Sequence, residues 1–406
     1  MAHGPRHRQL LIARRPLLQG SLVSAVAALL SGCTSGSQTF TTEAPPPAAA
    51  PAGPPVAGTQ IGTGNTRVAL ILPLSGPGNA GVAAQSMRNA AEMAIAEFKD
   101  PAIQLLVKDD AGSPQGAQQA AQQALGEGVQ LVLGPLFAQS VSAAAQVVRP
   151  RGIPIIAFST DANVASRGVY LLSFLPESDV QRIVSYAVSR GKRSFAALVP
   201  DNAYGAVVEA AFQQSIARNG GRVVALERYP LNPPAMQEPA RRIAQSASRA
   251  EAILIPDIPD NVPQVVAALQ ASGVNLKRLQ LLGTGLWDDP RIFSAPSLAG
   301  GWFPAPDRAG FRNFSQRYRA RYGQDPVRTA TLAYDAVALV AALQKTQGAA
   351  AFSEQVLTNS SGFAGIDGVF RFRPDGTNER ELAVMEVVSP DGRVINPAPR
   401  TFSART

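Results

Sequence analysis

Short apolar runs alternate with helical patterns over most of the chain beyond residue 67. The run 68–72 contains no polar position, and the stretch after it repeats apolar residues on one helical face from Met87 to Phe98. Continuous apolar runs separated by helices are typical of a parallel sheet covered on both faces. The pattern restarts near residue 195. The sequence therefore predicts an α/β fold with two doubly wound parallel-sheet lobes, a hinge and an interlobe cleft.

The expected elements form two series and a mixed last quarter. In the first series we expect strands at 68–72, 103–107, 131–133 and 153–157, and helices at 87–98 and 141–148, with an Ala- and Gln-rich helix between the second and third strands. In the second series we expect strands at 195–199, 222–225, 252–255 and 279–282, and helices at 207–217, 236–246 and 262–271. In the last quarter we expect helices at 311–322 and 331–345, and strands at 369–372 and 382–388.

Several expected strands run directly into proline. The pairs are Leu72-Pro73, Gly134-Pro135, Val199-Pro200 and Ile255-Pro256. Proline ends strand pairing, so these pairs mark the carboxyl ends of strands. Ligands of open parallel sheets bind at that edge, and the loops after these prolines are expected to line one shared crevice.

The amino-terminal segment has the pattern of a lipoprotein signal. A basic stretch and the apolar run 17–30 precede Leu30-Ser31-Gly32-Cys33, and the run is too short for an ordinary membrane-spanning helix. We expect a signal peptide over 1–32 and lipid attachment at Cys33. Arg14 and Arg15 also resemble a twin-arginine signal, and the choice between the two export routes stays open.

Residues 33–66 are polar and then rich in Pro, Ala and Gly, so they cannot bury a core and are expected to form an extended tether with a reach of up to about 100 Å. The expected division of the remaining chain is lobe 1 over 67–176 and 303–347, lobe 2 over 177–302 and 348–390, and a loose tail over 391–406.

Processing at Cys33 would remove much of the chemistry on which enzymes depend. The only histidines, His3 and His7, precede the cut, and acylation consumes the only thiol. This excludes histidine-based triads, cysteine nucleophiles and His/Cys zinc sites from the mature protein. We expect no catalytic residue, metal or cofactor. A carboxylate-pair enzyme stays open as an alternative, although no pair is singled out.

The net charge overstates the basic character of the mature protein. The chain has 37 Lys and Arg against 29 Asp and Glu, which gives +8. Four of the basic residues and no acidic residue precede Cys33, so the mature part carries 33 minus 29, or +4. Such a weak surplus favours no nucleic-acid partner.

The candidate cleft residues follow the expected strand ends. They are Ser75, Gly76, Phe137, Ser140, Ser159, Thr160, Asp161, Asn202, Tyr204 and Trp287. Gly76, Gly78 and Gly81 match a dinucleotide fingerprint, but Pro77 removes a backbone donor, and a ligand-contacting loop or simple turn is favoured.

Other polar groups have two interpretations each. Asp109 and Asp110 would point to opposite faces of a strand, which favours a capping or turn role. The stretch from Ser159 to Asp161 suits ligand hydrogen bonding or, equally, a helix cap. Tyr204 would stack on a ligand or pack in the hinge.

The densest basic stretch also has two interpretations. An amphipathic helix with a solvated arginine face is favoured over a surface for an acidic partner or anionic headgroups. Its arginines are Arg308, Arg312, Arg317, Arg319, Arg321 and Arg328.

The motifs together resemble the type I periplasmic binding proteins of the leucine-binding family, over roughly residues 67–388. The matching stretches are 72–77 (Leu-Pro-Leu-Ser-Gly-Pro), 108–110 (Lys-Asp-Asp), 133–136 (Leu-Gly-Pro-Leu), 201–205 (Asp-Asn-Ala-Tyr-Gly) and 365–368 (Gly-Ile-Asp-Gly). The resemblance implies a protein that closes on an amino acid or other small polar solute and delivers it to an ABC importer.

Two departures from that family point to a different branch. Only Ser140 remains where amino-acid binders place serines for the ligand carboxylate, and Asp161 puts a repulsive charge nearby. The chain is more similar to lipoprotein activators of penicillin-binding proteins, which implies a non-enzymatic protein that contacts a peptidoglycan synthase.

The solute receptor of an ABC importer is the alternative. The partners implied are thus a membrane through the lipid, a penicillin-binding protein or an ABC permease, and a small polar ligand. Thr34 after Cys33 implies the outer membrane, facing the periplasm.

Overall fold

The computed structural model describes residues 60–402 except 100 and 231. The expected signal peptide, the lipid site at Cys33 and residues 33–59 of the expected tether lie outside the described residues. The end of that tether is corrected, because 60–61 form a strand that pairs with 105–106 and Thr66 begins the next strand. The strands are β1 (Gln60–Ile61), β2 (Thr66–Leu72), β3 (Ile103–Asp109), β4 (Leu131–Leu133), β5 (Ile155–Ala157), β6 (Val169–Leu171), β7 (Ser194–Pro200), β8 (Arg222–Tyr229), β9 (Ala252–Leu254), β10 (Gln280–Leu282), β11 (Trp302–Ala305), β12 (Phe363–Gly365), β13 (Gly368–Phe372), β14 (Asn378–Arg380), β15 (Ala383–Val388) and β16 (Asp391–Asn396). The α-helices are α1 (Asn79–Glu97), α2 (Pro114–Gly126), α3 (Ala138–Val148), α4 (Pro176–Ser189), α5 (Ala203–Arg218), α6 (Gln237–Ala247), α7 (Val262–Ala271), α8 (Pro290–Phe293), α9 (Arg308–Tyr322), α10 (Ala330–Gln347) and α11 (Glu354–Leu357).

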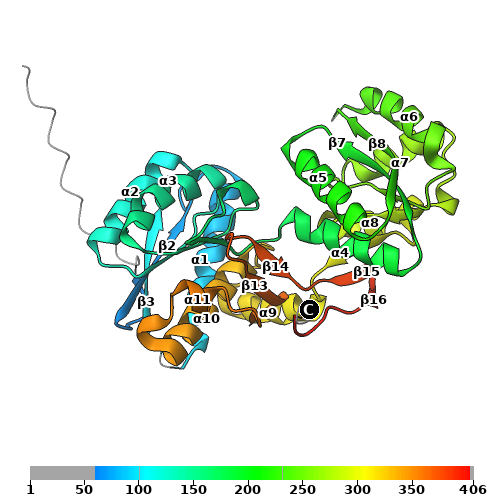
Figure 1. The fold of residues 1–406 in the computed structure, drawn as a ribbon. Helices are drawn as coiled ribbons and strands as arrows, with labels where there is room; N and C mark the ends of the chain where they lie inside the picture. Colours follow the sequence, from blue (N-terminus) through cyan, green and yellow to red (C-terminus); the bar gives the residue numbers. More distant parts are fainter. Residues whose placement is uncertain (1–59, 100, 231, 403–406) are drawn as a thin grey trace, which may run out of the picture. The chain divides into compact units, whose positions relative to one another are not determined.

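The first lobe is built on a six-stranded sheet in the order β1-β3-β2-β4-β5-β6. All its pairings are parallel except that of β1, and the buried strands carry apolar residues on both faces. In Figure 1, α2 and α3 cover one face of this sheet, and α1 and α10 cover the other. Double coverage explains why its strands are continuous apolar runs.

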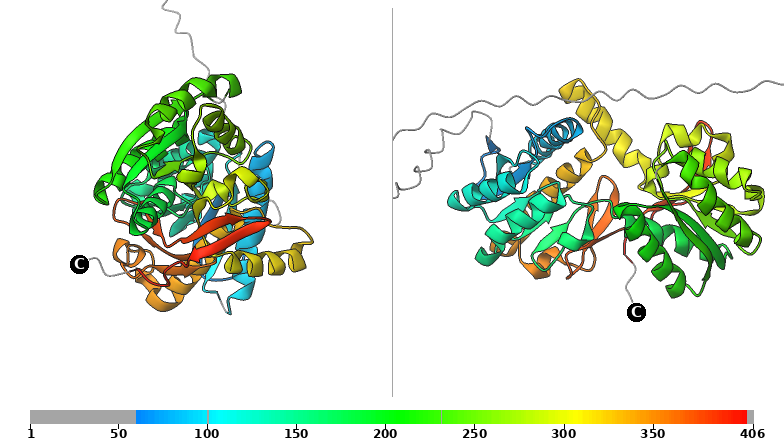
Figure 2. Two further views of the ribbon diagram at one scale, coloured as in Figure 1. Left: turned by 90° about the vertical axis from the view of Figure 1, so that its right-hand side faces the viewer. Right: turned by 90° about the horizontal axis from the view of Figure 1, so that it is seen from above.

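The second lobe is built on a seven-stranded sheet in the order β16-β15-β11-β10-β9-β7-β8. Helices α4 and α5 cover one face, and α6 and α7 cover the other. The red strands β15 and β16 in Figure 2 are antiparallel and close one edge of the sheet. The predicted α/β class and the two parallel-sheet lobes are therefore confirmed.

The chain passes between the lobes three times. The crossings lie between β6 and α4, between β11 and α9, and between β14 and β15. The last crossing shows that the lobe division differs from the expected one. Leu357, Phe370 and Phe372 pack in the core of the first lobe, so most of 348–390 belongs there, and only the part from Ala383 onward joins the second sheet.

Two further expectations are corrected. Residues 303–305 belong to β11 in the second sheet, although 303–347 was expected in the first lobe. The expected loose tail begins with β16, because the turn at Ser389-Pro390 folds Asp391–Asn396 back onto β15. Both corrections depend on long-range strand pairing, which local pattern does not report.

Candidate functional site

The carboxyl ends of the strands lie where the prolines predict them. β2 ends at Leu72 before Pro73, β4 ends one residue before Gly134-Pro135, and β7 ends at Pro200. Gly134 has a φ of 85°, and a Cβ there would lie 2.1 Å from the Ile71 carbonyl oxygen of the neighbouring strand. Only glycine fits this close approach of the two backbones.

A cavity of about 520 Å³ is lined by residues of all three crossing segments and by loops of the second lobe. The crossings and the ends of the elements beside them contribute Ser173, Phe174, Leu175, Pro176, Ser178, Asp179, Ala305, Pro306, Arg380 and Leu382. The loops after β7, β9 and β10 contribute Asn202, Tyr204, Asp257, Ile258, Gly285, Leu286 and Asp288. Thr160 and Arg328 of the first lobe complete the lining of this interlobe pocket.

One part of the pocket wall is acidic. Asp179 accepts a hydrogen bond from the Gly285 amide at 2.8 Å, and burial raises the pKa of Asp179 to about 7. Asp257 is buried and accepts hydrogen bonds from the Tyr229 hydroxyl and from the Ile258 amide, the latter at 2.7 Å. Asp288 forms an ion pair with Arg308. Each of these carboxylates therefore already has a protein partner.

Another part of the wall is cationic and aromatic. The Arg328 and Arg380 guanidinium carbons lie 4.8 Å and 5.1 Å from the centroid of the Phe174 ring. Arg328 makes a bidentate ion pair with Asp367, with nitrogen-to-oxygen distances of 2.6 and 3.0 Å. Arg380 is only 7% exposed, and its Nε and Nη2 groups have no hydrogen-bond acceptor. Asp367 and Asp335 place negative charge near this guanidinium, and its two unused donors would suit an anion that reached them.

Tyr204 contributes a hydroxyl to the pocket wall. Its oxygen lies 2.8 Å from Thr284 Oγ1, and burial raises its pKa, so the phenol stays protonated. Asn202 begins α5, and its side-chain oxygen accepts the Gly205 amide at 2.8 Å.

The structure brings three of the predicted cleft residues into this pocket, Thr160, Asn202 and Tyr204. The remaining first-lobe candidates do not line it. Ser75 donates its amide to Asp109, and Asp161 caps the short helix Ala162–Val164 through the Asn163 amide. Gly76 donates its amide to the Pro73 carbonyl in a turn.

Three more first-lobe candidates are placed elsewhere as well. Ser140 is fully buried, and Ser159 is 3% exposed. Phe137 is 40% exposed at the start of α3. The predicted turn role of Asp109 and Asp110 is confirmed, because they accept the amides of Ala111 and Gly112.

Trp287 was predicted to line the cleft, but it does not lie in the wall of the interlobe pocket. It is fully buried, packs in the core of the second lobe and donates its indole N–H to the Ile255 carbonyl at 3.0 Å. A tryptophan that follows a Gly-Thr-Gly turn looks available to a ligand, but its large apolar ring is stabilised more by burial.

Sequence reasoning missed Asp179, Asp257, Arg328 and Arg380 as pocket residues. Asp257 could have been found, since it directly follows Ile255-Pro256. Arg380 had no such signal, because its place at the end of β14, paired with β13, brings it beside Phe174.

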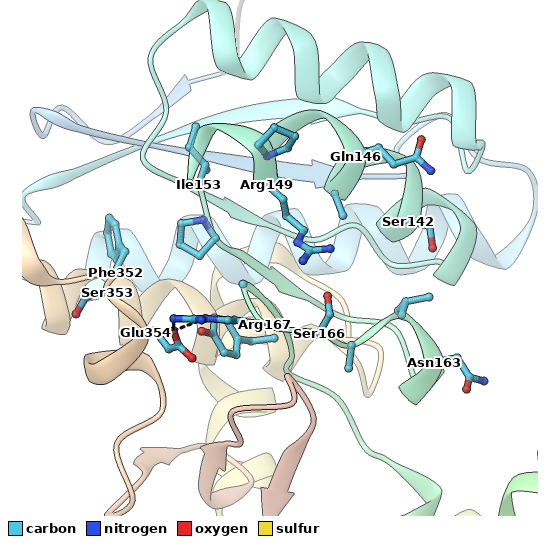
Figure 3. A pocket seen from close by; sticks show the side chains of 18 residues that line it. Ser142, Gln146, Arg149, Ile153, Asn163, Ser166, Arg167, Phe352, Ser353 and Glu354 are labelled. Atoms are coloured by element: carbon cyan, nitrogen blue, oxygen red, sulfur yellow. Dashed lines mark hydrogen bonds and ion pairs between the residues drawn. The ribbon is translucent and has the colours of Figure 1, made fainter.

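A second, wider cavity of about 830 Å³ lies on the first lobe alone. Figure 3 shows Ser142 and Gln146 of α3 and Arg149 of the turn after it along one side of this cavity, and Phe352 and the ion pair between Arg167 and Glu354 along another. None of its lining side chains has a buried polar atom without a partner. The interlobe pocket is therefore the better candidate site.

Among the described residues, no group of His, Cys, Asp and Glu is arranged to hold a metal ion. Within the same part of the chain, no helix combines the length and apolar character needed to cross a bilayer.

The model of the periplasmic binding protein family matches residues 65–393. Among solved structures, a putative branched-chain amino acid ABC transporter protein from Rhodospirillum rubrum has a TM-score of 0.73 and 20% identity, over 81% of this chain and 99% of that chain. A leucine binding protein from Thermotoga maritima has a TM-score of 0.55 and 16% identity, over 84% and 98%. A solute binding protein from R. palustris in complex with benzoate has a TM-score of 0.57 and 17% identity, over 84% and 98%.

At identities of 16–20%, these structures show only that the chain shares their fold. An uncharacterized protein of Rickettsia prowazekii is 22% identical over 180 residues, which are 44% of this chain. The matched region covers about half of the length of this curated relative, namely 47%.

Proposed function

Because the chain belongs to the periplasmic binding protein family, we propose that it is a non-enzymatic binding protein of the periplasm that captures a small solute in the interlobe pocket. The solute has an anionic group and an apolar body. Its delivery to an ABC permease is the function that the family and its structural relatives from ABC transporters favour.

One observation carries the choice of solute. Arg380 is buried with its Nε and Nη2 donors free, and Phe174 lies beside it. A carboxylate on these donors would satisfy both nitrogens, and Phe174, Ile258 and Leu286 would contact an apolar ring or chain.

The first lobe weighs against an α-amino acid. The Ser140 hydroxyl is buried away from the interlobe pocket, so the one remaining serine of its motif is not presented there. In the second lobe, the carboxylates of Asp179, Asp257 and Asp288 already have hydrogen-bond or ion-pair partners within the protein.

The test is calorimetric titration of benzoate against benzamide, which has the same ring without the charge. We expect benzoate to bind at least about tenfold more tightly, because hydrogen bonds to charged groups contribute about 1.5–3 kcal/mol. Arg380→Gln should remove the difference. Arg371→Gln, on the neighbouring strand and paired with Glu379, is the matched control. Equal affinity for acid and amide would contradict the proposed solute class.

Activation of a penicillin-binding protein is the second candidate function. Phe137 supports it, because this aromatic ring of the Gly-Pro-Leu-Phe stretch is 40% exposed at the carboxyl edge of the first sheet. A pull-down from envelope extracts should then recover a synthase with the native chain and less of it with Phe137→Ser. Recovery of no synthase at all would count against this candidate.

A further inference from the structure

The second lobe carries its positive charge at one edge of its sheet. Arg or Lys residues lie in, or directly beside, each of the helix-to-strand connections that lead into β7, β8, β9 and β10. These residues are Arg190, Lys192, Arg193, Arg218, Arg222, Arg249, Lys277 and Arg278, and together they are called the basic edge. All are exposed except the half-buried Lys192.

Sheet topology places these residues side by side. The strands β10, β9, β7 and β8 are consecutive in the sheet and parallel. At the amino edge the Arg222 amide donates to the Arg193 carbonyl at 2.8 Å, and the Gln280 amide donates to the Glu251 carbonyl at 3.0 Å. With strands about 4.8 Å apart, the basic edge extends about 15 Å across the sheet.

Little acidic charge lies among the cations of the basic edge, although Lys192 is near enough to Glu251 to help lower the pKa of that carboxyl. None of them forms an ion pair within the described chain. The one carboxylate in these connections, Glu251, is used by the amides of Arg193 and Ser194 at 2.7 and 2.9 Å. Lys192, Arg222, Arg249 and Arg278 line a groove of about 480 Å³ around it.

The arginine-rich helix α9 behaves differently. Arg317, Arg319 and Arg321 pair with Glu97, Asp325 and Glu92, so most of the charge that the sequence singled out is neutralised internally. The density of arginine in the sequence is therefore a poor guide to where unpaired charge lies.

Acidic residues of the second lobe gather at the opposite edge. Asp201, Asp257, Asp260, Asp288 and Asp289 all follow the carboxyl ends of strands. Cations near helix ends and acids near helix starts are favoured by the helix dipoles, which accounts for the sign at each edge. It does not account for the scarcity of counter-charges within the basic edge.

We propose that the basic edge docks on the surface of an anionic phospholipid bilayer. Exposed cations spread over four loops suit many mobile phosphate headgroups, and each Lys or Arg near such a surface contributes about 1 kcal/mol. Val223, 37% exposed beside Arg222 on the edge strand β8, adds an apolar contact. The lipid expected at Cys33 would keep the lobe close to a bilayer. Because the interlobe pocket is at the other ends of the same strands, docking leaves it facing away from that bilayer.

The test is sedimentation with vesicles of phosphatidylcholine alone or with phosphatidylglycerol added, using the mature chain from residue 33 onward with Cys33→Ser, so that neither the expected signal peptide nor an acyl group contributes. We expect binding to the anionic vesicles at low salt, its loss as salt rises, and none to neutral vesicles. The variant Lys192→Gln/Arg222→Gln/Arg249→Gln/Arg278→Gln should reduce partitioning by about tenfold or more.

The matched control is Arg149→Gln/Arg151→Gln/Arg312→Gln/Lys345→Gln, which removes the same charge from exposed first-lobe positions. It should retain binding within about threefold, and circular dichroism should show both variants folded. No binding to anionic vesicles at low salt, or an equal loss in both variants, would overturn the proposal. Stoichiometric binding of inorganic phosphate without vesicle binding would overturn it too, and would assign the groove to a small anion.

Discussion

Asp179 shows how burial changes the chemistry of a single residue. Its carboxylate lies in the pocket wall and accepts a hydrogen bond from the Gly285 amide, and its pKa is raised from 3.8 to about 7. Burial disfavours the charged form more than one amide hydrogen bond favours it. Asp335, buried with one oxygen unpartnered, has its pKa raised to about 7 for the same reason.

We predict that Asp179→Asn flattens the dependence of stability on pH. The native state holds the proton more tightly than the unfolded chain, so the contribution of Asp179 is full below pH 3.8 and is lost as pH rises to about 7. The asparagine oxygen still accepts the Gly285 amide, and the variant should lose less stability over this interval than the native chain.

Urea unfolding between pH 4 and pH 8 measures this slope. The exposed Asp201, changed to Asn, is the control and should leave the slope unchanged. An Asp179→Asn slope identical to that of the native chain would contradict the assignment.

At the scale of elements, caps and turns explain where several helices begin. Ser113 and Asn202 accept the amides of Gly116 and Gly205 and so start α2 and α5. The cap of α5 is also part of the pocket wall, so the same residue fixes a helix start and a binding surface.

We predict that Asn202→Ala lowers the free energy of unfolding by about 1 kcal/mol, because it leaves a helix amide without its acceptor. Asn202→Asp should retain most of the stability, since aspartate caps equally well. Chemical denaturation measures both changes. Ser113→Ala, outside the interlobe pocket, should cost a similar amount but leave solute affinity unaltered. Equal stability of the alanine and aspartate variants at position 202 would show that the cap contributes nothing.

At the scale of the whole described chain, Arg308 connects the two lobes through ion pairs. It is the first residue of α9, whose Phe314 and Tyr318 pack with the first lobe, yet its guanidinium pairs with Asp288 and Asp391 of the second. It also lies 4.7 Å from the centroid of the Phe293 ring.

We predict that Arg308→Gln destabilises the protein by roughly 1–3 kcal/mol, because two carboxylates lose a charged donor. Arg319→Gln, which breaks the exposed pair with Asp325, should cost less than about 1 kcal/mol. Thermal unfolding of both variants gives the comparison. A larger loss in Arg319→Gln would refute the bridging role.

Anchoring to a membrane is a separate proposal, and it rests on Cys33. We predict that labelled palmitate marks the native chain and not Cys33→Ser, because the acyl chains attach through this thiol or depend on it. The label should be recovered with outer-membrane fractions. Equal labelling of the two chains would eliminate Cys33 as the lipid site.

The sequence by itself determined the features that depend on near neighbours in the chain. Continuous apolar runs predicted the parallel sheets, and prolines predicted the carboxyl ends of β2, β4 and β7. Helix α4 was missed although Val180, Ile183, Val184 and Ala187 have helical spacing, so that omission could have been avoided.

Only the tertiary structure decided which polar groups are available to a solute. Ser140 and Trp287 follow expected strand ends but are buried, whereas Arg380 comes from β14, far along the chain, and lies beside Phe174. The physical reason is that burial and pairing of charge depend on contacts between segments distant in sequence, and a local pattern contains no record of these contacts.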